Sequence, residues 1–184
     1  MGGSGNAGSN KKDDPSLALD IDSVRTGGDT RTSLMVRNIP NKYTQKMFLD
    51  EIRAGGHGDG VDFFYLPLDF KNRCNRGYAF VNFMNAADIV PFYEQFNAKS
   101  WKKFNSDKVC AITYARIQGK AAMVKRFENS ALMEKEEAYK PLVFNNGQAE
   151  DFPVNLSGSD EGESDGGTGT GSGGSVGSGE RCLD

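Results

Sequence analysis

Four segments of the chain alternate apolar and polar residues with the period of two that is typical of a half-buried strand. Turn-forming stretches separate these segments, and the first one, for example, is followed by Asn-Ile-Pro at residues 38–40. The predicted strands are Ser33 to Arg37, Val61 to Leu66, Gly77 to Phe83 and Val109 to Ala115.

Two stretches between these strands carry apolar residues at helical spacing instead. Thr44 can cap the first helix, in which apolar residues such as Phe48 share a face. The second helix begins at Asn85, or near Val90 because Pro91 is tolerated only in the first turn. The order strand, helix, strand, strand, helix, strand predicts an α+β, ferredoxin-like βαββαβ fold. Its four-stranded antiparallel sheet would carry two helices on one face.

A third helix is expected after the last predicted strand. Residues 118–139 combine Ala, Leu, Met and Phe with Lys and Glu, a composition that favours helix. Periodicity does not decide whether this helix packs beside the sheet, covers it or extends into solvent. In one arrangement Met123 and Phe127 would lie over Tyr78 and Phe80 of the third strand.

The ends of the chain differ in composition from its middle. Gly, Ser, Asp and Glu dominate both ends, which leaves little apolar surface to offset the entropy lost on ordering. We expect a disordered tail at 1–30, the βαββαβ unit at 31–117, a helical extension of the same domain at 118–145 and a disordered acidic Gly/Ser-rich tail at 146–184.

Charge follows the same division. Residues 31–145 carry 18 Lys and Arg against 12 Asp and Glu, whereas the rest of the chain carries 4 against 13. A basic folded unit suits a polyanionic partner. The acidic stretch at 151–165 would either compete for the basic surface or simply keep the protein soluble.

The sequence lacks the residue arrangements that common enzymes and metal sites require. Cys74, Cys110 and Cys182 lack the paired spacing of a zinc site, and His57 is the only histidine. No Ser or Cys nucleophile has a histidine base in its motif, and no Gly-rich loop could cradle a phosphate. We therefore expect no enzymatic activity, no cofactor, no metal and no small-molecule substrate.

The sequence also indicates where the protein works. It contains neither a run of eighteen apolar residues nor the apolar core of a signal peptide. We expect a monomeric protein without membrane contact, inside the cell in the nucleus, the cytoplasm or both.

The octapeptide from Arg76 to Phe83 carries the main functional signal. Alternation along its strand turns Val81 and Phe83 toward the helices and leaves Arg76, Tyr78 and Phe80 on the uncovered face. Two exposed rings beside a cation can stack unpaired bases, at about 1–3 kcal/mol per base. The octapeptide matches the first ribonucleoprotein signature of the RNA recognition motif at every position. The competing interpretation makes both rings core residues beneath a covering segment.

Further candidates come from the neighbouring strands and loops. The companion hexapeptide at 34–39 has Met35 where an exposed aromatic residue is usual. If Val61 and Phe64 face the core, Phe63 and Tyr65 widen the aromatic surface. Loop cations could follow a phosphate backbone, although solvated charge is the simpler interpretation of any single one. The predicted RNA-binding residues are Met35, Arg37, Phe63, Tyr65, Lys71, Arg73, Arg76, Tyr78, Phe80, Thr113 and Arg116.

Three strings resemble the C-terminal RNA recognition motif of the Mei-two-like family. They are residues 37–43 (RNIPNKY), 64–72 (FYLPLDFKN) and 114–120 (YARIQGK), and the resemblance extends from about Asp29 to Ser130. It implies single-stranded RNA binding, with Tyr78 and Phe80 as binding residues, and a regulatory role in meiosis or, in plants, development. Members of this family are usually longer and carry further RNA recognition motifs upstream.

The sequence therefore predicts a non-enzymatic module that binds single-stranded RNA across its sheet. The alternative is a protein-interaction module of the same fold, in which the C-terminal helix covers the sheet or binds a protein partner. Deleting residues 121–139 would separate the two, because better RNA binding would indicate occlusion and loss of folding would indicate a brace.

Overall fold

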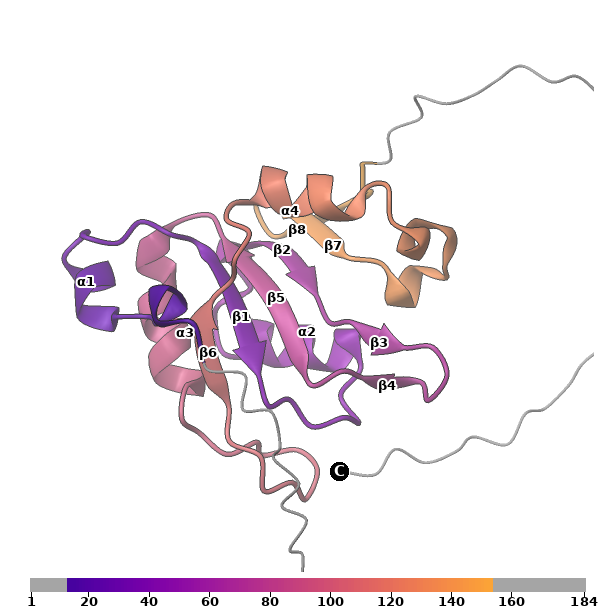
Figure 1. Ribbon diagram of the computed structural model, residues 1–184, viewed down its shortest axis with the longest axis horizontal. Coiled ribbons are helices and arrows are strands. Elements are labelled where there is room, and N and C mark those ends of the chain that lie inside the picture. Colours follow the sequence, from indigo (N-terminus) through magenta and orange to yellow (C-terminus); the bar gives the residue numbers. More distant parts are fainter. Residues whose placement is uncertain (1–12, 154–184) are drawn as a thin grey trace, which may run out of the picture.

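Six strands form one antiparallel sheet in the order β6-β1-β5-β2-β7-β8 (Figure 1). The structure is a computed structural model, and it describes residues 13–153. The strands of this sheet are β1 (Ser33–Arg37), β2 (Val61–Tyr65), β5 (Tyr78–Phe83), β6 (Ala111–Tyr114), β7 (Leu142–Asn145) and β8 (Gln148–Glu150). The predicted ferredoxin-like order is confirmed, and the sheet has two strands more than the four expected.

Helices α2 (Gln45–Ala54) and α3 (Ile89–Phe96) cover one face of the sheet. Their apolar sides pack on Val36 of β1 and Val81 of β5, both fully buried. The Thr44 hydroxyl accepts a hydrogen bond from the Met47 amide at 3.2 Å and so caps α2 as predicted. Pro91 lies in the first turn of α3, where its missing N–H costs no hydrogen bond.

A bulge in β2 sets which of its side chains face each side of the sheet. Opposite β5, the register shifts between Val61, which pairs with Phe83, and Phe63, which pairs with Asn82. The extra residue lets both Val61 and Phe64 face the helices although they are three positions apart and would face opposite sides in a regular strand. Phe63 is consequently on the other face, as predicted.

The C-terminal extension differs from the expected helix. Helix α4 covers only Lys120–Phe127, and the chain continues through the 3-10 turns Ala131–Glu134 and Glu137–Tyr139 into the β7–β8 hairpin. Asn146 and Gly147 both have positive φ, 48° and 77°, as a tight hairpin turn requires. The helix expected within 118–139 thus ends at Phe127, and the extension at 118–145 is only partly helical, because Asn-Gly after a β-forming stretch favours a hairpin.

The prediction of disorder was also too wide at both ends. From Asp13 on, the N-terminal segment contains a 3-10 turn (Pro15–Leu17) and α1 (Ile21–Arg25). Val24 of α1 is buried in the core beside α3, which offsets the entropy of ordering. At the other end β8 lies within the predicted tail. The remainder of the two predicted tails, residues 1–12 and 154–184, lies outside the described residues.

Gln118 joins the start of the extension to β1. Its side-chain oxygen accepts hydrogen bonds from the amides of Thr32 and Ser33 at 3.1 and 3.0 Å. Its side-chain nitrogen donates to the carbonyls of Ser33 and Ala115 at 2.9 and 2.8 Å. Three of these bonds hold the chain leaving β6 against the start of β1, and the fourth closes a local turn with Ala115.

We expect Gln118→Ala to lower the free energy of unfolding by about 1–3 kcal/mol, because it leaves partly buried backbone groups without partners. Urea denaturation measures this loss. Gln148→Ala on exposed β8 is the matched control and should change stability by less than about 0.5 kcal/mol. Equal effects of the two substitutions would show that the Gln118 bonds do not hold the extension.

The described residues contain neither a cluster of metal ligands nor a helix that could span a membrane. Within 13–153, no three His, Cys, Asp or Glu side chains are arranged to hold a metal ion. The ring of His57 bonds to the Gln95 side chain at 2.8 Å, and Cys110 is a buried free thiol. In the same range, no helix combines the length and apolar character that crossing a membrane demands.

Candidate nucleic-acid interface

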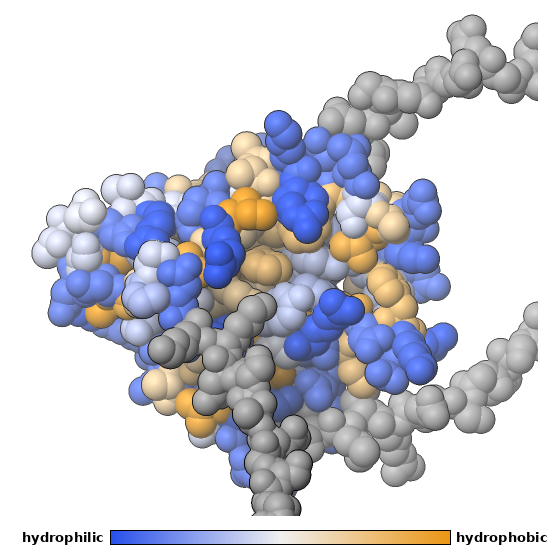
Figure 2. Space-filling view, viewed as in Figure 1, coloured by the Kyte–Doolittle hydropathy of each residue, from blue (hydrophilic) through white to orange (hydrophobic). Residues whose placement is uncertain are grey.

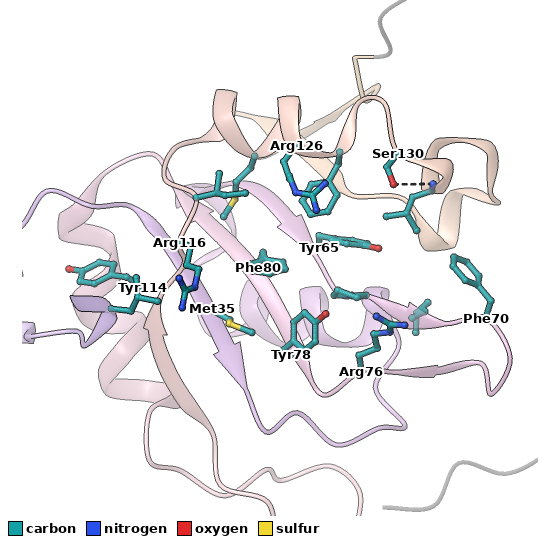
Figure 3. A pocket seen from close by; sticks show the side chains of 17 residues that line it. Met35, Tyr65, Phe70, Arg76, Tyr78, Phe80, Tyr114, Arg116, Arg126 and Ser130 are labelled. Atoms are coloured by element: carbon teal, nitrogen blue, oxygen red, sulfur yellow. Dashed lines mark hydrogen bonds between the residues drawn. The ribbon is translucent and has the colours of Figure 1, made fainter. Parts of the chain in front are cut away.

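Alternate residues of β1 and β5 form the face of the sheet opposite α2 and α3. Met35 pairs with Phe80, and Arg37 pairs with Tyr78. Met35, Tyr78 and Phe80 are half-buried, whereas their neighbours Val36 and Ala79 are fully buried on the helix side. The predicted alternation of the octapeptide is therefore confirmed. We refer to this side of the sheet as the open face (Figure 3).

Asn75, a buried residue, fixes the entry into the octapeptide. Its side-chain nitrogen donates to the carbonyls of Pro40 and Tyr43 at 2.7 and 2.9 Å. Its side-chain oxygen accepts from the Gly77 amide at 2.7 Å. Gly77 has φ +85°, a conformation that other residues rarely adopt, so the turn requires glycine. Together they place Arg76 and Tyr78 at the edge of the open face.

The rings of the octapeptide are arranged edge to face rather than stacked on each other. The centroids of Tyr78 and Phe80 lie 5.7 Å apart with 76° between the ring planes. Phe80 also lies 6.4 Å from Phe127 of α4. Because the rings do not stack face to face, part of each ring plane is left for another flat group.

The open face is covered at its β2 side, where Phe127 packs on Phe63 and Tyr65. Phe127 stacks on Phe63 at 6.1 Å between centroids and meets Tyr65 edge to face at 5.0 Å. Phe63 is 0 % exposed and Tyr65 is 4 % exposed. The two rings were predicted on the correct face, but the prediction that they widen the exposed surface was wrong. Ala115, Met123 and Val143 are the other buried residues of this apolar cluster.

Tyr65 still reaches the open face with its polar end. Its ring is buried, but the residue lines the groove described below (Figure 3). Burial raises the pKa of Tyr65 to about 12. The hydroxyl is therefore protonated at neutral pH, and it can both donate and accept a hydrogen bond.

A groove of about 580 Å³ runs across the open face. Met35, Tyr78 and Phe80 lie in the centre of the view in Figure 3, with Arg126 at one border and Arg76 and Phe70 at another. In Figure 2 the middle of this side of the molecule is apolar and its borders are hydrophilic. An apolar floor with cations around it suits a flat aromatic group attached to an anionic chain.

Three exposed arginines border the groove: Arg76 before β5, Arg116 after β6 and Arg126 on α4. Arg37 is also on this face, and its guanidinium is paired with Asp13 at 2.7 Å. Each guanidinium presents several N–H donors in a fixed plane that matches a phosphate.

The remaining predicted residues do not line this groove. Thr113 of β6 pairs with Met35 and is half-buried. Lys71 and Arg73 are exposed in the turn between β3 (Leu68–Asp69) and β4 (Cys74–Asn75). Arg73 lines a different groove, between this hairpin and α2. The structure thus brings together six of the predicted residues at the groove: Met35, Tyr65, Arg76, Tyr78, Phe80 and Arg116.

Sequence reasoning assigned no binding role to the other groove residues, among them Leu17, Phe70, Ile117 and Arg126. Phe70 is 46 % exposed and packs on Tyr139 at 5.1 Å between centroids. The spacing of Met123 and Phe127, four residues apart on α4, was the one sequence signal that this segment meets the sheet. Nothing comparable pointed to Phe70 or Leu17.

Comparison with known proteins gives the family. The model of the family "RNA recognition motif 2" matches residues 31–128, which is more than half of the chain. Protein MEI2-like 4 of rice (Oryza sativa subsp. japonica) is 50 % identical over 155 residues, covering 82 % of this chain and 15 % of the relative. Protein MEI2-like 5 of Arabidopsis thaliana is 52 % identical over 126 residues, covering 68 % of this chain and 16 % of the relative.

This chain thus spans only about a sixth of the length of these relatives. Among solved structures, "Structure of Rna15 RRM with bound RNA (GU)" is 17 % identical, with a TM-score of 0.38, over 46 % of this chain and 82 % of that one. A score below 0.5 adds nothing to the assignment, which depends on the family model and the sequence relatives. The match confirms the resemblance seen in the three strings, and the chain belongs to the RNA recognition motif 2 family, as an RNA recognition motif of the Mei2-like proteins.

Proposed function

We propose that this domain binds single-stranded RNA in the groove of the open face. The observation that carries the proposal is the pair Tyr78 and Phe80, whose half-exposed rings form an apolar floor bordered by arginines. Folding alone gives no reason to leave two aromatic rings in a groove that opens to solvent. Unpaired bases can stack on such rings, whereas bases in a duplex are already stacked on each other.

Each part of the groove has a separate role in this proposal. Tyr78 and Phe80 stack bases, and Arg76, Arg116 and Arg126 contact phosphates. The Tyr65 hydroxyl reads a base edge from the covered side. Phe63 has no part in binding while Phe127 covers it. The groove is then short, and a few nucleotides fill it.

We do not extend the proposal to the alternative of a protein-binding module with a covered sheet. Helix α4 covers Phe63 and Tyr65 but leaves Tyr78 and Phe80 half-exposed. The apolar side of α4, with Met123 and Phe127, is itself packed on the sheet. That side is therefore not presented to a protein partner.

Titration of the domain with labelled single-stranded and double-stranded RNA of random sequence tests the proposal. We expect single-stranded RNA to bind more tightly. Raising salt from about 50 to 200 mM should weaken binding about twentyfold if three arginines contact phosphates. Absence of binding to single-stranded RNA, or equal binding of the duplex, would refute the proposal.

The RNA itself is best identified by selection from a random pool. The resemblance to Mei-two-like proteins supports, as a further part of the proposal, an intracellular regulator of RNAs in meiosis or development. Crosslinking of RNA in cells would test that part independently, since the bound transcripts either do or do not belong to such programmes.

A further inference from the structure

Two consecutive aspartates of the N-terminal segment lie against two arginines at the open face. An Asp13 carboxylate oxygen is 2.7 Å from a guanidinium nitrogen of Arg37, and an Asp14 oxygen is 3.6 Å from one of Arg116. Arg37 is on β1, and Arg116 follows β6, the strand paired with it. One acidic dipeptide therefore neutralises two cations on neighbouring strands of the sheet.

The segment is held in this place by contacts of its own. Asp14 caps the 3-10 turn that follows it, because its side chain accepts hydrogen bonds from the Ser16 amide and hydroxyl at 3.0 and 2.7 Å. The carbonyl of Ser16 accepts a bond from Arg31 at 2.8 Å. Leu17 then lines the groove. The aspartates are thus brought to the arginines by a folded turn.

Arg37 retains donor capacity that Asp13 does not use. One terminal nitrogen of Arg37 bonds to the aspartate, but the Nε–H of Arg37 is buried and has no hydrogen-bond partner. A buried donor without an acceptor is unfavourable, and a second acceptor oxygen would satisfy it. A phosphate group offers two oxygens to the fork of a guanidinium.

We propose that Arg37 and Arg116 form a paired phosphate site for RNA and that Asp13 and Asp14 occupy this site in the free protein. The inference rests on the proposed function and adds its regulation, because RNA has to displace the dipeptide to reach both arginines. Asp13 and Asp14 act as a tethered competitor, and the folded segment that connects them to β1 keeps their local concentration high.

The contacts are weak enough to be displaced. The Asp13 side chain is 75 % exposed, and the Asp14 contact with Arg116 is longer than a hydrogen bond. Arg37 holds the pKa of Asp13 below its usual value, so the aspartate is charged at neutral pH. Exposed pairs of this kind contribute little to stability and are screened by salt. The competitor therefore tunes affinity and does not abolish binding.

The test is a double substitution, Asp13→Asn and Asp14→Asn, which keeps the cap of the turn because asparagine caps as well as aspartate. At low salt we expect single-stranded RNA to bind about three- to tenfold more tightly. The matched control is Asp50→Asn with Glu94→Gln, which removes the same charge from α2 and α3 on the opposite face. It should change affinity less than twofold, about the limit of the measurement.

A second comparison uses Arg37→Gln with Arg116→Gln. In that background, the aspartate substitutions should change RNA affinity no more than the control does. The inference is overturned if the Asp13/Asp14 and Asp50/Glu94 variants change RNA affinity equally. It is also overturned if the Asp13/Asp14 substitutions still raise RNA affinity when Arg37 and Arg116 are replaced.

Titration with inorganic pyrophosphate, followed by NMR, separates this inference from the proposed function. Pyrophosphate needs no base stacking, and the Asp13/Asp14 variant should bind it more tightly than the wild type does. If the variant gains pyrophosphate affinity but the domain binds no single-stranded RNA, the phosphate site stands and the proposed function fails. If RNA binds but the Asp13/Asp14 substitutions change the affinity for neither RNA nor pyrophosphate, only the inference fails.

Discussion

The double substitution of Tyr78→Ala and Phe80→Ala should weaken binding of single-stranded RNA about a hundredfold or more. Each ring is expected to stack one base, and removing one base stack costs about 1–3 kcal/mol. Fluorescence anisotropy with a short labelled RNA measures the loss. The rings are half-exposed, so their removal should leave the fold intact, which circular dichroism can verify.

Met84→Ala is the control for this experiment. Met84 is a large apolar side chain that is 41 % exposed just beyond β5, and it does not line the groove. Its removal should leave RNA affinity within about twofold of the wild type, since it makes no contact with the proposed site. If the Tyr78/Phe80 variant bound RNA with wild-type affinity, the stacking role would be refuted. If Met84→Ala lost as much RNA affinity as that variant, the effect would be nonspecific.

Phe127→Ala should have the largest effect on stability, lowering the free energy of unfolding by about 2–4 kcal/mol. Phe127 packs on both Phe63 and Tyr65, so its truncation leaves a cavity over two large rings. Lys125→Ala is the matched control on the same helix, exposed to solvent, and should stay within about 0.5 kcal/mol. Urea denaturation of the two variants gives both values.

The same variant distinguishes two roles of α4, which either stabilises the fold as a brace or covers part of the RNA-binding surface as a lid. As a brace, α4 keeps Phe63 out of water, and Phe127→Ala lowers stability without a marked gain in RNA affinity. If stability were unchanged and RNA bound much more tightly, α4 would instead be a cover that hides part of the binding surface. We expect the wider deletion of residues 121–139 to prevent folding. It removes Phe127 and also the segment that connects the sheet to β7.

Much of the fold could be predicted because local pattern and tertiary environment agree in the central part of the chain. Apolar and polar residues alternate in β1, β5 and β6 because one face of the sheet packs on the helices and the other face forms the groove. In β2, by contrast, simple alternation cannot place Val61 and Phe64 on the same side, and a bulge resolves the conflict. The hydrophobic character of both residues predicted the right side without revealing the bulge.

The prediction was wrong where a long-range contact decides the structure. Burial of Phe63 depends on Phe127, more than sixty residues later in the chain, and period-two alternation is blind to such a partner. Likewise, the ends were predicted as disordered from their polar composition, although Val24 is buried in the core and Leu17, Leu19 and Ile21 pack against it. The contacts of Asp13 and Asp14 follow from that packing.

These corrections change the proposed RNA surface. It does not extend from the octapeptide across β2, because α4 covers that side. It extends instead toward Arg126 on α4 and toward Phe70 in the β3–β4 hairpin. The octapeptide and the family match identify an RNA recognition motif, while the covering helix and the hairpin give this domain its particular groove.

NMR of the labelled domain during titration with single-stranded RNA tests the central claim most directly. We predict that signals of the Met35 methyl group and of the Tyr78 and Phe80 rings shift, with nuclear Overhauser contacts between those rings and RNA bases. Signals of Phe92 and Met84, on the helix side and beyond β5, should stay in place. Shifts confined to the helix side, or binding without contacts between base and ring, would contradict the account.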